Sequence, residues 1–402
     1  MKKYKLGELI EINNGTRYSH LQEGDIPLYG SGGLMSYVND YLYDGKAILL
    51  PRKGTLTNIM YTEGKIWTVD TMYYAKVNEK ANAYYLYSYL SLLNLAHLDS
   101  GSALPSMTRW AYNNIEVVLP SLKTQNEIAD LLQSFDAKIE LNNKINQELE
   151  AMAKTLYDYW FVQFDFPNED GQPYKSSGGK MVYNEELKRE IPKGWENGVL
   201  SDIADITMGQ SPAGNSYNEE GIGVVFYQGS TDFGARFPTV RMYTTKPKRM
   251  AKEGDILLSV RAPVGTLNQA MEDCCIGRGL AALRETEGSN SFLFSQLAYF
   301  KQIFDRRNAS GTTFGSINRG DLFGLKLCIP DKKVLENFKE IVDPLHEMIV
   351  VNSKQNIELA ELRDWLLPML MNGQVTVGDG YAAKEEVLGM VAEDGVHYNK
   401  TL

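Results

Sequence analysis

Basic side chains beside glycine-rich turns are the part of this sequence best suited to chemistry. Glycine allows a loop to approach a crowded surface, and arginine presents several N–H donors to a phosphate group or to the edge of a guanine base. Taken singly, each such residue is more often a solvated or ion-paired surface residue. The candidates for contacts of this kind are Arg17, Arg52, Lys53, Arg109, Arg236, Arg241, Arg261, Arg278 and Arg319.

Two of these motifs occur twice along the chain. Arg52 precedes Gly54-Thr55, and Arg261 precedes Gly265-Thr266. Arg109 stands three residues after a serine, and Arg319 does the same. The repetition leaves two interpretations open, which are a shared role in binding an anion or a base edge and an ordinary distribution of surface charge.

No motif of a catalytic site accompanies these residues. The sequence has no glycine-rich loop ending in Lys-Ser/Thr, no Asn/Asp-Pro-Pro-aromatic motif and no GxSxG. Its four histidines are scattered without metal-ligand spacing, and its three cysteines include no CxxC pair. We therefore predict neither catalysis nor a bound metal or cofactor in this chain.

The elements that must position the basic residues are duplicated. Residues 100–161 align with residues 310–371 without a gap, and a weaker repeat matches residues 6–15 with residues 200–209. Identical pairs in the long repeat include Ser106 and Ser316, Arg109 and Arg319, and Asn142 and Asn352. Each copy is expected to be a globular part followed by a long helix, which suggests a target that is itself bipartite.

Each globular part is predicted to be rich in β-strands. In the first, short apolar runs at 47–50 and 66–69 lie between turn signals, and one helix is expected at 83–95. In the second, strands are expected near 223–227, 255–260 and 325–329, and a helix near 292–304. The predicted fold class is therefore α+β.

Two long helices are expected from apolar residues that recur every three or four positions after Lys123 and again after Phe338. Each covers roughly 40 residues, or about 60 Å, and its single apolar stripe needs a partner helix. Asn142 and Asn352 fall within the stripes, where they either fix the register of a coiled coil or point to solvent at its edge. Pro344 is expected to kink or delay the second helix.

In an antiparallel arrangement of these helices, the segment that connects the modules has the shortest distance to span. It would place the globules at opposite ends of the helix pair, related by an approximate two-fold axis. The expected parts are a first globule (1–120), a first spacer helix (121–164), a linker (165–198), a second globule (199–330), a second spacer helix (331–372) and a tail (373–402).

The distribution of charge is more informative than the net charge of −10. Residues 1–120 carry 11 basic and 11 acidic side chains, and residues 199–330 carry 14 and 13, so both globules are near neutral. The acidic surplus lies in the helices, linker and tail, where a protein partner could dock. No apolar run is long enough to span a membrane, and we expect a cytoplasmic protein without a membrane partner.

Several stretches together resemble the specificity (S) subunit of type I restriction-modification enzymes, over essentially the whole chain. They are LPSLKTQNEIA at 119–129, the spacer helix from Asn142 to Glu150, FYQG at 226–229, SVRAPVG at 259–265 and CIGRGLAA at 275–282. The resemblance implies two target recognition domains, each reading half of a split, asymmetric site in double-stranded DNA. It also implies that an antiparallel helix pair sets the gap between the halves.

The same resemblance implies partners that supply the chemistry. Two methyltransferase (M) subunits would bind this chain and methylate adenine with S-adenosylmethionine, and restriction (R) subunits that use ATP and Mg²⁺ would attach through them. The globules differ at Asp70-Thr71-Met72-Tyr73, where the second has Arg278-Gly279-Leu280-Ala281. Different half-sites are therefore expected.

Two other functions compete with this interpretation. A fused restriction-methylation enzyme would need a methyltransferase or nuclease domain that this chain has no room to contain. A coiled-coil adaptor, whose globules bind proteins instead of DNA, remains open because both globules are near neutral.

Overall fold

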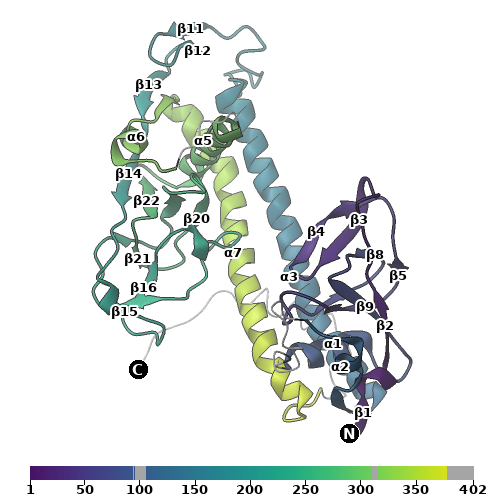
Figure 1. The fold of residues 1–402 in the computed structure, drawn as a ribbon. Coiled ribbons are helices and arrows are strands. Elements are labelled where there is room, and N and C mark those ends of the chain that lie inside the picture. The colour runs from purple at the N-terminus through teal and green to yellow at the C-terminus, as the bar shows by residue number, and fades with distance from the viewer. Residues whose placement is uncertain (94, 96–105, 310–314, 378–402) are drawn as a thin grey trace. The chain divides into compact units, whose positions relative to one another are not determined.

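The computed structural model describes residues 1–93, 95, 106–309 and 315–377. The chain forms two compact units, Met1–Ile139 with Glu358–Leu402 and Glu140–Ile357. Each unit contains one β-rich globule and a stretch of each of the two long helices, α3 and α7 (Figure 1). Among the described residues, none of the helices combines the length and the apolar character needed to cross a membrane.

The globule of the first unit is built on two four-stranded sheets. One sheet has the order β2 (Ile10–Asn14), β9 (Met72–Val77), β6 (Ala47–Pro51) and β7 (Met60–Thr62). The other has the order β4 (Gly33–Val38), β3 (Glu23–Gly30), β8 (Lys65–Thr68) and β5 (Tyr43–Asp44), with β3 parallel to β8. A two-stranded sheet pairs β1 (Lys2–Lys5) with β10 (Glu116–Leu119).

Strand β6 shows why the first globule folds in this way. Its apolar run is buried on both faces: Ile48 and Leu50 belong to the core that contains α1 (Ala83–Ser91), whereas Ala47 and Leu49 pack with Ile66 of the second sheet. A strand buried on both faces reads as a continuous apolar run, without alternation. Short helices η1 (Leu6–Glu8) and α2 (Arg109–Asn113) complete the globule.

The globule of the second unit repeats this plan. Its first sheet has the order β14 (Ala204–Met208), β22 (Leu280–Glu285), β19 (Ile256–Ser259) and β20 (Leu267–Gln269). Its second has the order β15 (Tyr217–Asn218), β17 (Tyr243–Thr244), β16 (Val224–Tyr227), β21 (Cys274–Ile276) and β18 (Met250–Ala251), with β16 parallel to β21. The remaining elements are β13 (Glu196–Val199) paired with β23 (Lys326–Ile329), α4 (Leu200–Ile203), η4 (Gly214–Ser216), η5 (Ser230–Asp232), α5 (Ser291–Ala309) and α6 (Arg319–Phe323).

Matched backbone contacts confirm the weak repeat at the start of each globule. The amide of Gly15 donates to the carbonyl of Met72 at 2.9 Å, and the amide of Gly209 donates to that of Leu280 at 2.9 Å. A Cβ atom on Gly15 would lie 2.0 Å from the Val69 carbonyl oxygen, and one on Gly209 would lie 2.1 Å from that of Gly277. Both positions therefore require glycine because the neighbouring backbone fills the space of a side chain.

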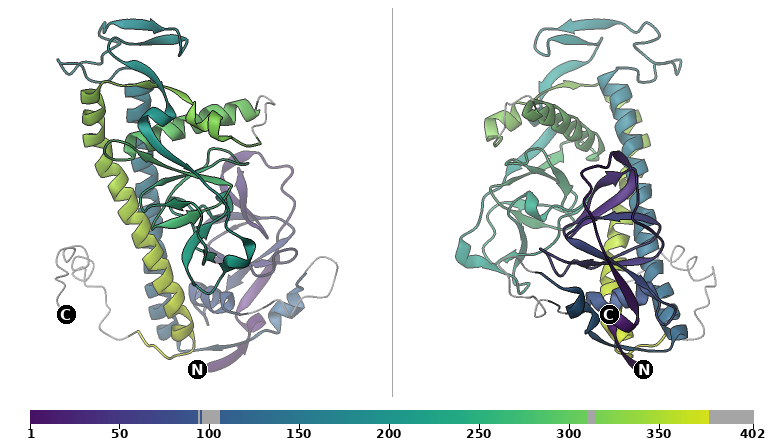
Figure 2. Two further views of the ribbon diagram at one scale, coloured as in Figure 1. Left: turned by 90° about the vertical axis from the view of Figure 1, so that its left-hand side faces the viewer. Right: turned by 45° about the vertical axis from the view of Figure 1, so that its right-hand side comes forward.

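The two long helices, α3 (Leu122–Tyr157) and α7 (Lys332–Met371), pack together as predicted (Figure 1 and Figure 2). In the second unit, the Asn142 amide donates to Asn356 Oδ1 at 2.9 Å, and the Asn352 amide donates to Asn146 Oδ1 at 2.9 Å. In the first unit, Arg363 Nη1 donates to Asp136 Oδ1 at 2.6 Å. Residue numbers rise along one helix as they fall along the other, so the pair is antiparallel.

The two asparagines within the apolar stripes do not bond to each other. Asn142 is fully buried and also donates to Gln355 Oε1 at 2.8 Å, whereas Asn352 is partly exposed. In the repeat, Asn142 corresponds to Asn352 and Asn146 to Asn356. The two asparagine contacts are therefore the same contact made once from each helix.

Pro344 does not delay the second helix, which was one of the two effects that we expected of it. Helix α7 begins at Lys332, which is the repeat equivalent of Leu122 at the start of α3, and it continues through Pro344. The proline lies about three turns inside the helix, where packing of the flanking residues Phe338, Val342 and Leu345 maintains the helical path.

The segment that connects the two modules has more structure than a linker. After α3 the chain makes a wider helical turn, η3 (Asp158–Val162), and later forms a hairpin of β11 (Met181–Asn184) and β12 (Arg189–Pro192). Trp195 is buried and stacks on Phe166 with ring centroids 5.0 Å apart. These rings join Phe161 and Phe338 in an aromatic core at this end of α3.

The close approach at Gly209 predicts a large cost for Gly209→Ala. The added methyl group would overlap a backbone carbonyl that cannot move without disturbing β22, so we expect a loss of about 2 kcal/mol or more in the free energy of unfolding. Gly214→Ala is the matched control because no atom lies within 4 Å of its added Cβ. Urea titrations that give the same midpoint for both variants would contradict the argument.

Candidate nucleic-acid interface

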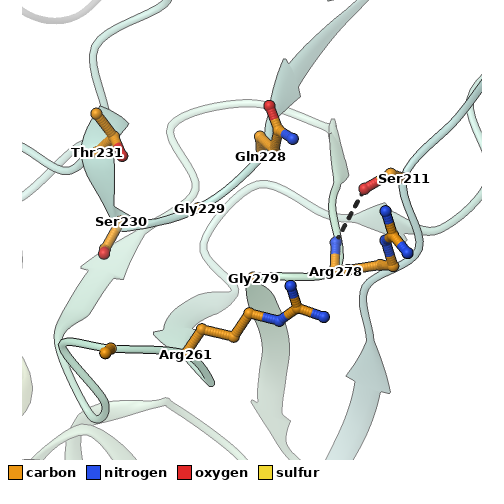
Figure 3. Close-up of a pocket in the computed structure, with 9 residues that line it drawn as sticks. Ser211, Gln228, Gly229, Ser230, Thr231, Arg261, Arg278 and Gly279 are labelled. Carbon is orange, nitrogen blue, oxygen red and sulfur yellow. Dashed lines mark hydrogen bonds between the residues drawn. The ribbon is translucent and has the colours of Figure 1, made fainter. Parts of the chain in front are cut away.

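A hollow in the second globule brings together two of the predicted basic residues, Arg261 and Arg278. Arg261 follows β19, and Arg278 lies between β21 and β22. Figure 3 shows both side chains at the hollow together with Gln228 and Ser211. The lining residues are Ser211, Gln228, Gly229, Ser230, Thr231, Arg261, Ala262, Arg278 and Gly279.

Backbone contacts fix the loops that carry these arginines. The amide of Val260 donates to the Gly279 carbonyl at 2.9 Å, which ties the Arg261 loop to the Arg278 loop. The Arg278 amide in turn donates to Ser211 Oγ at 3.3 Å (Figure 3). A Cβ on Gly279 would lie 2.7 Å from the Gln228 carbonyl oxygen, so this glycine allows the strand end that carries Gln228 to lie against the arginine loop.

The hollow offers donors and acceptors suited to DNA. Arg261 and Arg278 are exposed, and neither forms a salt bridge with any described residue. Free guanidinium groups bind phosphate or the O6 and N7 atoms of guanine, and a glutamine amide matches the donor and acceptor of adenine. The serine and threonine hydroxyls of the lining add contacts of lower specificity.

The uncharged residues of this lining were not among the predicted site residues. Gln228, Ser230 and Thr231 carry no charge, and the predicted residues were all basic. The signal was present because Gln228 belongs to the FYQG stretch that carries the family resemblance.

A second hollow shares Gln228 and contains Arg241. Its other lining residues are Glu219, Phe226, Asp232 and Met242. Arg241 Nε donates to the buried carboxylate of Asp232 at 2.7 Å, although the arginine side chain remains 59% exposed. This ion pair partly neutralises Arg241, which makes it a weaker candidate for phosphate than Arg261 or Arg278.

Arg236 does not lie at the surface, and the structure contradicts its prediction as a DNA contact. Its side chain is only 5% exposed. The guanidinium lies over the Phe294 ring, 4.1 Å from the centroid, and its Nη2 lies 3.0 Å from His346 Nδ1 on α7. Sequence could not show this burial because the contacts lie 58 and 110 residues further along the chain.

In the first globule, Lys53 occupies the backbone position of Arg261. Lys53 forms an isolated bridge with Ser106, as Arg261 does with Ser316, and these serines are equivalent in the repeat. The sequence match of Arg52 with Arg261 is therefore wrong by one residue. Arg52 instead takes the position of the buried Val260, and its carbonyl accepts from the Met107 amide at 3.0 Å.

Arg52 and Arg109 lie together on one aromatic ring. Their guanidinium carbons lie 6.0 and 5.8 Å from the centroid of Tyr73. Arg109 is the first residue of α2 and is exposed, and Trp110 beside it is 75% exposed. The first globule thus gathers Arg52, Lys53 and Arg109 near the start of α2.

The position of Arg278 carries the opposite charge in the first globule. The Arg52 amide donates to the Thr71 carbonyl at 2.8 Å, and the Val260 amide donates to the Gly279 carbonyl in the same way. Thr71 therefore corresponds to Gly279, and the residue before it, Asp70, corresponds to Arg278. Arg17 is exposed in the loop after Gly15. It corresponds to Ser211, because the residues before them, Thr16 and Gln210, donate their amides to the carbonyls of Thr68 and Ile276, which are equivalent. The positive charge is therefore distributed differently on the same scaffold.

Arg319 remains an exposed candidate in the second globule. It is the first residue of α6, in the position that Arg109 has in α2, and its guanidinium carbon lies 4.8 Å from the centroid of the Phe323 ring. The structure does not place Arg319 among the residues that line the Arg261 hollow.

The loops between equivalent strands differ in length. In the first globule β3 and β4 are joined by the tight turn Ser31-Gly32, whereas in the second globule residues 228–242 connect β16 to β17. The β4 hairpin strand exposes Leu34, Met35 and Tyr37. The two globules thus present different side chains from one topology.

Comparisons with known proteins agree with this architecture. The family model "Type I restriction modification DNA specificity domain" matches residues 1–151 and 192–361, well over half of the chain. A putative type I restriction enzyme MjaX specificity subunit from Methanocaldococcus jannaschii is 31% identical over 276 residues, which span 68% of this chain and 62% of that protein. The HindI specificity subunit of Haemophilus influenzae is 24% identical over 351 residues, covering 70% and 73% of the two chains.

A solved structure supports the fold. The crystal structure of a type I restriction-modification S subunit from M. genitalium matches with a TM-score of 0.60 over 92% of this chain and 95% of that chain, at 15% sequence identity. The shared features are two β-rich domains and two long helices packed together. The chain therefore belongs to the family of DNA specificity subunits of type I restriction-modification systems, which confirms the resemblance seen in its sequence.

Proposed function

We propose that this chain reads a bipartite DNA target, with one half-site assigned to each globule and the gap between them set by α3 and α7. One observation carries the proposal: the same backbone position holds an exposed basic side chain in both globules, Lys53 in one and Arg261 in the other. Contacts to phosphate fix the register of a DNA-binding protein, and contacts to base edges give it specificity.

Differences between the two interfaces support an asymmetric target. The first globule has Asp70 where the second has Arg278, and a carboxylate accepts from cytosine N4 whereas a guanidinium donates to guanine. The residues we assign to the interface are Arg17, Arg52, Lys53, Arg109, Arg241, Arg261, Arg278 and Arg319, with Gln228 added and Arg236 removed. We assign residues 1–120 and 199–330 to reading, and residues 121–164 and 331–372 to spacing.

The long helices are our proposed docking surface for methyltransferase subunits. On α7, Ile341, Met348 and Val351 are exposed in the second unit, and Leu362 and Trp365 in the first. Spacings of three and seven residues among them are those of a second apolar seam, which suits a helical partner. We propose that two M subunits with S-adenosylmethionine bind there, and that R subunits with ATP and Mg²⁺ attach through them.

The proposal is tested by binding of duplex DNA to this chain in complex with an M subunit. We expect sequence-selective retention whose affinity falls as salt rises, because basic side chains displace counterions from phosphate. Retention that is independent of sequence at every salt concentration would contradict DNA reading and would favour the coiled-coil adaptor.

Arg261→Ala and Arg278→Ala should each weaken discrimination in only one half-site. A bidentate arginine contact is worth about 1–3 kcal/mol, so we expect a loss of roughly 5- to 150-fold in preference at one base pair. Methylation of duplexes with single base changes measures this preference. Arg249→Ala, which removes an exposed arginine outside both hollows, should leave the preference intact.

Lengthening both helices should change the gap and leave the half-sites unchanged. Four residues inserted between Asn142 and Asn146, with the matching four after Asn352, add about 6 Å to each helix. That length corresponds to about two base pairs at ~3.4 Å each. Methylation of a duplex series with gaps of increasing length gives the result, and a changed half-site with the original gap would exclude the spacer role.

Asn142→Leu should raise stability and lower the accuracy of the gap. Leucine removes the cost of burying an amide in the seam, but it also removes the bonds to Gln355 and Asn356 that fix the register. We expect a higher melting temperature together with methylation of targets whose gap differs by one base pair. Gln147→Leu, at an exposed position on α3, provides the control, and unchanged gap selectivity in Asn142→Leu would remove the register role.

A further inference from the structure

Arg236 is a buried cation between the second globule and the helix pair. Its Nε donates to Gln269 Oε1 at 3.1 Å, and its backbone carbonyl accepts from the Gln269 amide at 2.9 Å. The far end of the side chain contacts Phe294 of α5 and His346 of α7. The side chain therefore connects one loop of the globule to a spacer helix, within the second unit.

The loop that contains Arg236 also lines both hollows of the proposed DNA interface. Its first residues, 228–231, line the hollow with Arg261 and Arg278, and Asp232 and Arg241 line the other. Bonds within the loop make it one body: the Thr239 amide donates to the Asp232 carbonyl at 2.7 Å, and Phe233 bridges Pro238. The Phe233 amide also donates to the Ser230 carbonyl at 3.1 Å, so these bonds connect the segment around Arg236 to residues that line the hollows.

The electrostatics of the site give Arg236 one preferred placement. Burial and the charge of Arg236 lower the pKa of His346 to about 3, so the imidazole is neutral and its Nδ1 accepts from the arginine. Burial lowers the pKa of Arg236 to about 10, opposed by the negative charge of Glu150 on α3, and the side chain stays cationic at neutral pH. A buried cation is tolerated only where its partners lie, which favours a single position of the loop.

The first unit has a different contact at the equivalent helix position. Asp136 on α3 is the repeat equivalent of His346, and it bonds to Arg363 of α7 and to Tyr84 of α1. These groups join a helix of the globule to the helix pair, and none of them belongs to the short turn between β3 and β4. Anchoring of a DNA-facing loop on a spacer helix is thus found in the second unit.

We propose that Arg236 is a positioning residue that holds the 228–241 loop on α7, so that Gln228, Ser230 and Thr231 meet the bases of the second half-site. This inference rests on the proposed function. The body of the globule is held separately, by packing of Phe292 against Phe338 and by the bond from Tyr157 Oη to Gln296 Oε1 at 2.8 Å. Loss of Arg236 therefore moves the loop and leaves the gap unchanged.

The test uses the complex of the full chain with its M subunit, after the wild-type target has been identified by methylation profiling. Methylation rates are measured on duplexes with single base changes in either half-site and on duplexes with a gap changed by one base pair. For Arg236→Met we expect discrimination in the second half-site to fall about tenfold or more, with the first half-site and the gap unaffected. Arg236→Lys, which keeps the charge, should recover part of the loss.

Two further variants separate the positioning role from general damage. Asp136→Asn alters the equivalent helix position of the first unit and should leave the second half-site unaffected. His346→Leu removes the imidazole that accepts from Arg236 and keeps the arginine, so it should cause the same loss of discrimination in the second half-site as Arg236→Met. This variant keeps the test valid if Arg236→Met shows no cooperative melting transition.

Three outcomes overturn the inference. The first is a loss of base discrimination that is equal in both half-sites. The second is a change in the preferred gap length with base discrimination intact. The third is full base discrimination in folded Arg236→Met or His346→Leu. If discrimination is intact in these variants while Arg261→Ala or Arg278→Ala weakens it, only the positioning role fails. If none of the four variants changes it, reading by this hollow fails as well.

Discussion

The packing of α3 against α7 is the constraint on which the rest of the molecule depends. Each helix has one apolar stripe, and neither would be stable alone at that length without a surface to cover the stripe. Their polar contacts, Asn142 with Asn356 and Asn352 with Asn146, permit one antiparallel register. Each globule packs its own helix, α1 or α5, on residues of this pair.

The globules show how one scaffold supports two interfaces. Positions that require close backbone approach are the same in both, such as Gly15 and Gly209, because any side chain there would collide with a carbonyl. Positions that point to solvent are under no such constraint and differ in charge, as Asp70 and Arg278 do. The strand order is retained, and the loops that face outward are free to acquire different chemistry.

Most of the architecture could be predicted from the sequence because it depends on patterns among residues that are close together in the chain. The apolar stripes predicted both helices, and the ungapped repeat predicted that the two helices are equivalent. Their first residues, Leu122 and Lys332, are equivalent in the repeat. Pro344 does not delay α7, because contacts of the packed helix outweigh the loss of one backbone bond. The structure of residues 158–195 was underestimated because its stability comes from aromatic contacts with distant residues such as Phe338.

The candidate site was predictable in type but not in detail. The sequence predicted basic side chains beside glycines, but it matched Arg261 with Arg52, whereas the structure matches it with the next residue, Lys53. In extended backbone a shift of one residue exchanges a buried side chain for an exposed one. Arg236 was taken for a surface residue because its partners, Phe294 and His346, are distant in sequence. Gln228 was overlooked because an uncharged side chain gives no signal until the fold places it beside two arginines.

The most direct measurement of the central claim is methylation profiling of a host genome that carries this chain with an M subunit. We predict methylated adenines within one motif of two different half-sites separated by a fixed number of unspecified base pairs. A continuous motif, two identical half-sites, or a gap of variable length would contradict the account of two diverged readers held by one antiparallel helix pair.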